Sequence, residues 1–175
     1  MPMYAIEYYN QATSLRPYDC RMWTALATVY EGLQRIPNAI QAHTRALLGA
    51  DRIQTPTILS KLAALHTTLS GGSTSKEAVA YHKRLLALGE RVTGLGTGTG
   101  VQMETVELAA SYLAIAEYEM RDVGEGEGEG RERGDWALAA QYLEKVASTH
   151  APQRDKAEDL LRELRLKEAR LAANI

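Results

Sequence analysis

The feature that most constrains the fold is an internal repeat with a period near 34 residues. In its clearest copy, large and small residues recur at three- and four-residue spacing, on one face of a helix: Trp23, Leu26, Ala27 and Tyr30. A second helical stripe follows, with small residues on either side of a ring: Ala39, His43 and Ala46. Short helices with such faces bury them by packing against each other, so each copy predicts one helical hairpin.

This order of residues is typical of the tetratricopeptide repeat (TPR), whose two helices alternate large and small residues in this way. The small residues let the helices approach closely, and the large ones fill the space beside them. An earlier helix B and a third copy show the same pattern: Ala5, Tyr9, Ala12 and Pro17, then Leu59, Leu62, Ala63, His66, Ala78, His82 and Leu85. The sequence therefore predicts an all-α, TPR-type α-solenoid of antiparallel helix pairs with a C-terminal capping helix.

The expected solenoid is one segment over residues 1–172. Its parts are helix B of a truncated repeat (1–19), a repeat (20–53), a repeat (54–92), a repeat (101–150) and the capping helix (153–172). The later parts depend on the following apolar residues: Leu113, Ala114, Ala139, Leu143 and Val146, then Ala157, Leu160, Leu161, Leu164 and Leu171. Because the chain begins with a helix B that lacks its helix A, we expect it to be a fragment of a longer repeat protein.

Local signals agree with these boundaries. Asp19 is placed to cap one helix, Pro37 lies where a first turn needs no amide donor, and Thr55 with Pro56 predicts another helix start. Two Gly-rich stretches, 93–100 and 124–134, interrupt the pattern. We expect the first to be a mobile loop, and the second a disordered insertion, because alternating Gly and Glu combine high backbone entropy with charge repulsion.

Composition excludes several classes of function. A net charge of -2 offers no basic field, so we expect no nucleic-acid partner. The single Cys20 forms no internal disulfide and lies in no Cys/His cluster, which fits a reducing compartment, nuclear or cytosolic. No window approaches the run of about 20 apolar residues that a membrane span needs, so we expect no membrane association.

We also expect no enzyme activity, cofactor or metal. The glycine-rich stretch lacks the preceding strand and the following Gly-Lys-Ser/Thr of a phosphate-binding loop. The histidines His43, His66 and His82 occupy packing slots of the repeats, and neither a His-x3-His nor a Cys-x2-Cys pair is present. We therefore assign no catalytic, cofactor-binding or metal-ligating residue.

Residues 8–33, which read YYNQATSLRPYDCRMWTALATVYEGL, make a family resemblance visible. The chain resembles the carboxy-terminal TPR region of subunit eight of the anaphase-promoting complex, the cell division cycle protein twenty-three family. The resemblance covers residues 1–166 and is closest over 1–66. It is carried by the following residues: Leu15-Arg16-Pro17, Asp19, Arg21-Met22, Ala25-Leu26, Tyr30-Glu31, Lys61-Leu62-Ala63, Leu65-His66 and Tyr112-Leu113-Ala114.

The resemblance implies a non-catalytic scaffold of a cell-cycle E3 ubiquitin ligase, nuclear and cytoplasmic. Its implied partners are the other subunits of the complex and the activator protein, whose short basic motif enters the repeat groove. Members of the family are longer and form homodimers through amino-terminal repeats. Because this chain resembles only the last repeats, we expect it to lack that dimer interface.

Peptide ligands of TPR solenoids generally bind along the stacked A helices, which line the concave surface. The helical spacing places seven residues there as groove candidates: Arg21, Thr24, Thr28, Glu31, Ser60, Ala64 and Thr67. Glu31 is the strongest of them, because its carboxylate can pair with an arginine of a basic ligand. The alternative is that these are ordinary solvated helix positions.

Two other binding functions remain open. One is a free-standing TPR adaptor with an unknown peptide ligand. The other is a chaperone adaptor that clamps an acidic carboxyl-terminal peptide. Such a clamp needs Lys, Arg and Asn on the inner face of helix A, where this chain has Thr24, Thr28, Ser60 and Ala64.

Overall fold

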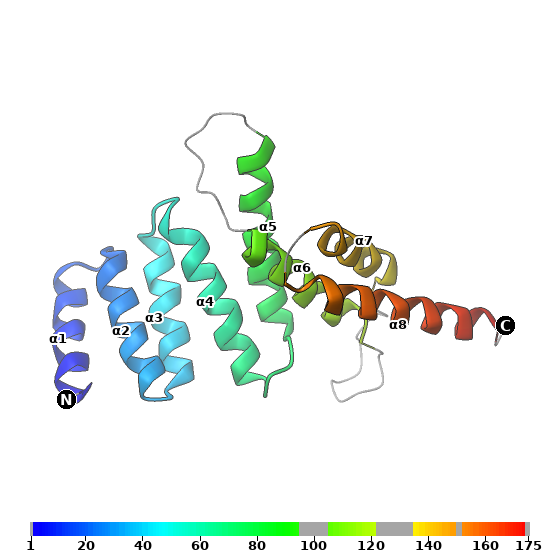
Figure 1. Cartoon of the computed structure of the whole chain (residues 1–175). Coiled ribbons are helices and arrows are strands. Elements are labelled where there is room, and N and C mark those ends of the chain that lie inside the picture. Colours follow the sequence, from blue (N-terminus) through cyan, green and yellow to red (C-terminus); the bar gives the residue numbers. More distant parts are fainter. Residues whose placement is uncertain (1, 95–104, 122–134, 150–151, 174–175) are drawn as a thin grey trace. The chain divides into compact units, whose positions relative to one another are not determined.

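The computed structural model describes residues 2–94, 105–121, 135–149 and 152–173. Within these ranges the chain forms eight α-helices and no strand (Figure 1). Each helix packs mainly against its neighbours in sequence. The expected all-α class is confirmed, and the arrangement is that of a helical repeat built from neighbouring pairs. The chain divides into two compact units, Met1–Val101 and Gln102–Ile175.

The first unit contains five helices, which follow one another from blue to green in Figure 1. They are α1 (Pro2–Leu15), α2 (Cys20–Gly32), α3 (Ile36–Leu48), α4 (Gln54–Leu69) and α5 (Lys76–Gly94). The α2–α3 and α4–α5 pairs form two successive hairpins, and α3 also packs against α4. One hairpin therefore lies within each of the expected repeats 20–53 and 54–92.

Small residues lie at the helix contacts of this unit, as the spacing predicts. Ala27, Ala39 and Ala46 are completely buried. Leu26 and Leu62 beside them are at most 2% exposed, and burial of each such leucine contributes about 1.5–3 kcal/mol. The alternation of small and large residues is thus the packing pattern of the α2–α3 and α3–α4 contacts.

The helix starts are set by specific side chains. Asp19 caps α2, because its Oδ1 accepts a hydrogen bond from the Arg21 amide at 3.1 Å. Pro37 lies in the first turn of α3, as expected. The predicted role of Thr55 as a cap is wrong. Asp51 accepts from the Ile53 and Gln54 amides at 3.0 and 2.8 Å, and α4 begins at Gln54, so Thr55 is already inside the helix.

The loop between α1 and α2 touches the end of α3 at Gly49. A Cβ built on Gly49 would lie 2.0 Å from the Tyr18 carbonyl oxygen. The Gly49 φ of -109° suits any residue, so glycine is needed for the close approach and not for backbone conformation.

We expect Gly49→Ala to lower the free energy of unfolding by about 1–3 kcal/mol, because backbone atoms must move to admit the methyl group. Gly32→Ala is the matched control, since a Cβ there meets nothing within 4 Å and Gly32 lies at the end of α2. The control should be neutral or stabilising by up to about 1 kcal/mol. Urea denaturation followed by circular dichroism measures both; equal effects would contradict the assignment.

The second unit is built from α6 (Thr105–Glu119), α7 (Trp136–Ala147) and α8 (Arg154–Ala173). The α6–α7 pair forms a hairpin and α8 packs against α7. The buried core comprises Ala109, Leu113, Ala116, Met120, Ala139, Leu143, Val146, Ala157, Leu161 and Leu164. Lys156 of α8 pairs with Glu117 of α6 at 2.6 Å and closes the unit at its surface.

Most of the expected core positions of the second unit are confirmed. Leu113, Leu143 and Val146 are buried, whereas Ala114 is only half-buried because Ala116, not Ala114, lies on the core face of α6. The predicted insertion 124–134 lies outside the described residues. Of the predicted loop 93–100, residues 93 and 94 continue α5 and the rest lies outside the described residues.

His82 of α5 ties the stability of the first unit to pH. Burial of its ring lowers the pKa of His82 below the ordinary 6.5, because the charged form loses solvation. The unfolded chain therefore binds a proton more readily than the folded one below about pH 6.5. The free energy of unfolding falls as the pH drops from 6.5 toward the folded-state pKa.

We expect His82→Gln to flatten the slope of the free energy of unfolding between pH 7.5 and 5. The shifted carboxylates do not interfere, because the pKa values of Asp19 and Glu77 lie below 3.8 and 4.5. Arg84→Gln on the same helix is the control, since arginine does not titrate in this range. An unchanged slope in His82→Gln, measured by urea denaturation, would refute the assignment.

Candidate peptide-docking surface

Four of the seven groove candidates lie on α2. Arg21 is exposed and its guanidinium pairs with Asp19, with Nε 3.3 Å from Oδ1. Thr24 and Thr28 donate their hydroxyl protons to the carbonyls one turn earlier, at 2.9 and 3.0 Å. These three side chains are thus engaged within α2 itself.

The other three candidates lie on α4. Ser60 is half-buried and Ala64 is exposed. Thr67 is half-buried and donates to the Ala63 carbonyl at 3.0 Å. Within the described part of the chain, no hydrogen bond or ion pair joins Ser60, Ala64 or Thr67 to the candidates on α2.

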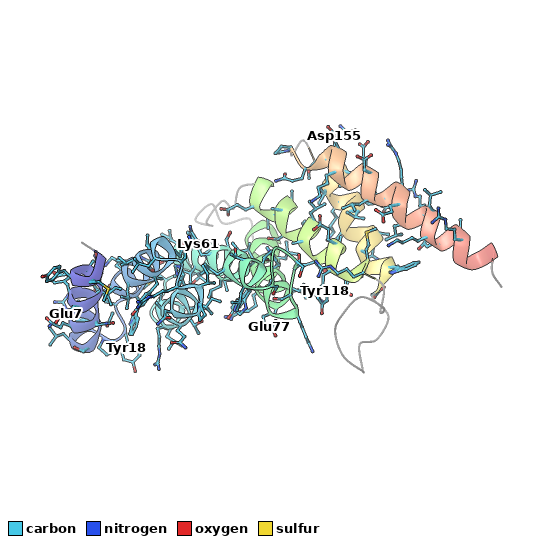
Figure 2. The ribbon with its side chains drawn as sticks, turned by 90° about the horizontal axis from the view of Figure 1, so that it is seen from below. Glu7, Tyr18, Lys61, Glu77, Tyr118 and Asp155 are labelled. Atoms are coloured by element: carbon cyan, nitrogen blue, oxygen red, sulfur yellow. The ribbon has the colours of Figure 1, made fainter. Side chains whose placement is uncertain are left out.

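Glu31, at the end of α2, is the candidate that connects helices. Its Oε1 lies 2.7 Å from His43 Nε2 on α3, and its Oε2 lies 3.7 Å from Lys61 Nζ on α4. Figure 2 labels Lys61 on its helix. One carboxylate therefore links both helices of a hairpin to the first helix of the next.

His43 is the buried member of this network. Its side chain is 2% exposed, compared with 24% for Glu31 and 56% for Lys61. A carboxylate only accepts hydrogen bonds, so Nε2 carries the proton and donates. The other ring nitrogen, Nδ1, is buried and has no hydrogen-bond partner. The single bond to Glu31 is thus the polar anchor of an otherwise enclosed ring.

The spacing placed His43 in a packing slot and did not assign Lys61 to the site. His43 does pack, but it also donates to Glu31, which no local pattern could show because the partners are twelve residues apart. Lys61 follows Glu31 by nearly one repeat period. Equivalent surfaces of successive repeats lie side by side, and that period was the signal that could have identified the pair.

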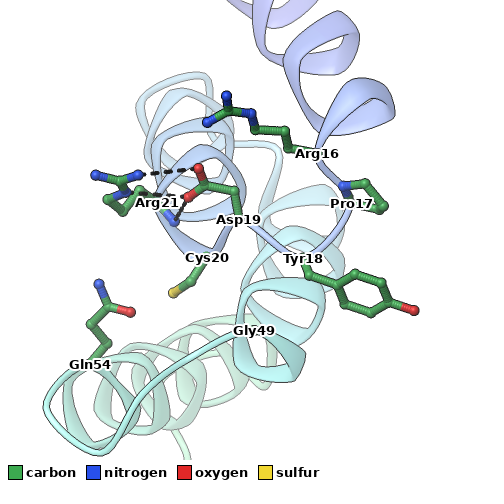
Figure 3. A pocket seen from close by; sticks show the side chains of 8 residues that line it. All are labelled: Arg16, Pro17, Tyr18, Asp19, Cys20, Arg21, Gly49 and Gln54. Atoms are coloured by element: carbon green, nitrogen blue, oxygen red, sulfur yellow. Dashed lines mark hydrogen bonds and ion pairs between the residues drawn. The ribbon is translucent and has the colours of Figure 1, made fainter.

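A hollow of about 430 Å³ lies away from Glu31, where the loops before α2 and α4 meet (Figure 3). It is lined by Arg16, Pro17, Tyr18, Asp19, Cys20, Arg21, Gly49 and Gln54. The Arg21–Asp19 ion pair lies at this hollow, which sets Arg21 apart from the other groove candidates. Cys20 is buried there, with its Sγ 3.8 Å from the Thr24 hydroxyl.

No protein-family model matches this sequence, and a search of curated proteins found no match. Among the described residues, no group of three His, Cys, Asp or Glu side chains could hold a metal ion. In the same part of the chain, no helix has the length and apolar character of a membrane span.

We expect a coupling free energy of about 1.5 kcal/mol between Glu31 and His43, the value typical of a hydrogen bond to a charged group. A double-mutant cycle of Glu31→Ala and His43→Phe in urea denaturation measures it; Phe keeps the ring and removes the donor. Glu7→Ala replaces Glu31→Ala in the control cycle, because Glu7 is exposed and has no described contact with His43. The control should be additive within about 0.5 kcal/mol. Equal coupling in both cycles would refute the link.

Proposed function

We propose that this chain is a TPR-type scaffold that docks a basic peptide segment along α2 and α4. The observation that carries the proposal is the succession of two α-hairpins with Ala27, Ala39 and Ala46 buried at the TPR packing positions. Stacked hairpins of this kind present their first helices together as an extended binding surface.

The partner follows from the family resemblance. We propose that the chain serves as a non-catalytic scaffold of the anaphase-promoting complex, nuclear and cytoplasmic, and contacts the other subunits and the activator protein. The residues of the resemblance include Glu31 and Lys61, which contact each other across α2 and α4. The finer TPR type and the capping function of α8 belong to the same proposal.

Charge supports a basic ligand over an acidic one. The half-buried carboxylate of Glu31 lies between α2 and α4, and a carboxylate attracts the guanidinium of a ligand arginine. The chaperone-type clamp for an acidic peptide has less support, because Thr24, Thr28, Ser60 and Ala64 offer no cation on these faces. A TPR adaptor with a different peptide ligand is the alternative.

The test is a calorimetric titration of the chain with a peptide that carries the activator's basic motif. We expect Glu31→Lys to weaken binding at least tenfold, because an attractive charge becomes a repulsive one, and Glu31→Gln to weaken it about threefold to tenfold. Glu7→Lys on α1 makes the same change of charge on an exposed residue away from α2 and α4, and should bind like the parent chain.

Two results would count against this site. Equal binding by the parent and Glu31→Gln, with unchanged circular dichroism, would remove Glu31 from the site. Equal weakening by Glu7→Lys and Glu31→Lys would show that only net charge matters. An acidic peptide that binds more tightly than the basic one would favour the clamp function.

A further inference from the structure

We propose that Lys61 is an internal occupant of a cation site formed by the Glu31 carboxylate, and that an arginine of a docked peptide binds there by displacing it. This inference rests on the proposed peptide-docking function and identifies one residue that limits its affinity. Lys61 and His43 thereby acquire different functions at the same carboxylate.

His43 holds the carboxylate in place from the core. Its Nε2 lies 2.7 Å from Oε1, within ordinary hydrogen-bond distance, and its side chain is enclosed at 2% exposure. A ring that is packed on all sides cannot follow a moving carboxylate. The position of Oε1 is therefore fixed from inside the α2–α3 hairpin, and His43 is a positioning residue.

Oε2 is the oxygen left for a cation. Lys61 Nζ lies 3.7 Å from it, beyond the 2.7–3.2 Å of a good N–H···O bond. The lysine side chain is 56% exposed, and its four-carbon stem is flexible. Glu31 itself is 24% exposed, so solvent reaches it. The ammonium is thus a weakly held occupant that can swing away into water.

An arginine side chain fits the vacated position better than lysine does. A guanidinium offers several N–H donors in one plane, and each carboxylate oxygen has two lone pairs. The incoming group can therefore bond Oε2 and share Oε1 with His43, whereas Lys61 makes one long contact. Displacement also separates the ligand from a like charge. Peptides without a cation gain nothing at this site.

Methylguanidinium chloride is a probe that tests the cation site without the activator peptide. The full chain, labelled with ¹³C and ¹⁵N, is titrated at constant ionic strength while the Glu31 Cδ resonance is followed. We expect Lys61→Met to lower the half-saturating concentration about twofold to fivefold, the range for loss of an exposed ion pair. Lys76→Met removes an exposed lysine from the first turn of α5 and should titrate like the parent.

Two outcomes would overturn the inference: equal half-saturation for Lys61→Met and the parent chain, or a Glu31 Cδ resonance that does not move in Lys61→Met. Lys61→Gln takes its place if Lys61→Met fails to fold by circular dichroism. If methylguanidinium behaves as expected while the basic peptide binds neither chain, the cation site stands and the docking function fails. If the peptide binds but Lys61→Met leaves both affinities unchanged, docking stands and the function of Lys61 is refuted.

Discussion

The close approach of helices at Ala27, Ala39 and Ala46 is the constraint on which the first unit depends. All three are completely buried, so a larger side chain at any of them would separate helices that now touch. The same spacing determines which longer side chains can meet. Glu31 reaches both His43 on α3 and Lys61 on α4, because the small residues bring these helices together. The polar network is therefore a consequence of the apolar packing.

The loops follow the same constraint. Where α1 passes to α2, the Tyr18 carbonyl lies so close to Gly49 that no side chain fits between them. Asp19 and Asp51 satisfy the first amides of α2 and α4 with their own carboxylates, so both helices can begin next to crowded turns. The caps and the glycine contribute no large stabilisation individually. Together they let successive hairpins approach as closely as their alanines permit.

Sequence patterns predicted the parts of this fold that depend on local spacing. Helical periodicity and the small residues give α2, α3 and the buried face of α4 directly, since each depends on neighbours three or four residues away. Thr55 was a wrong cap because Asp51, four residues earlier, also suits that function, and spacing alone does not choose between two capping side chains. Seven groove candidates were placed on their helices correctly. The pattern could not show that Thr24 and Thr28 donate to their own helix, or that Lys61 reaches Glu31, because both depend on rotamers and on the pitch between repeats.

His43 shows how a packing position can also determine chemistry. The TPR pattern needs a ring at this position, and an apolar ring would pack there without any buried polar atom; this chain contains no Phe at all. The imidazole instead brings Nδ1 into the core without a hydrogen-bond partner, which costs stability. The bond from Nε2 to Glu31 offsets part of that cost and fixes one carboxylate oxygen. A histidine that served only to fill space would be a poor choice here, whereas one that orients Glu31 toward α4 has a reason to be polar. The orientation of the candidate docking residue is thus determined from within the core, and the surface around it is free to vary.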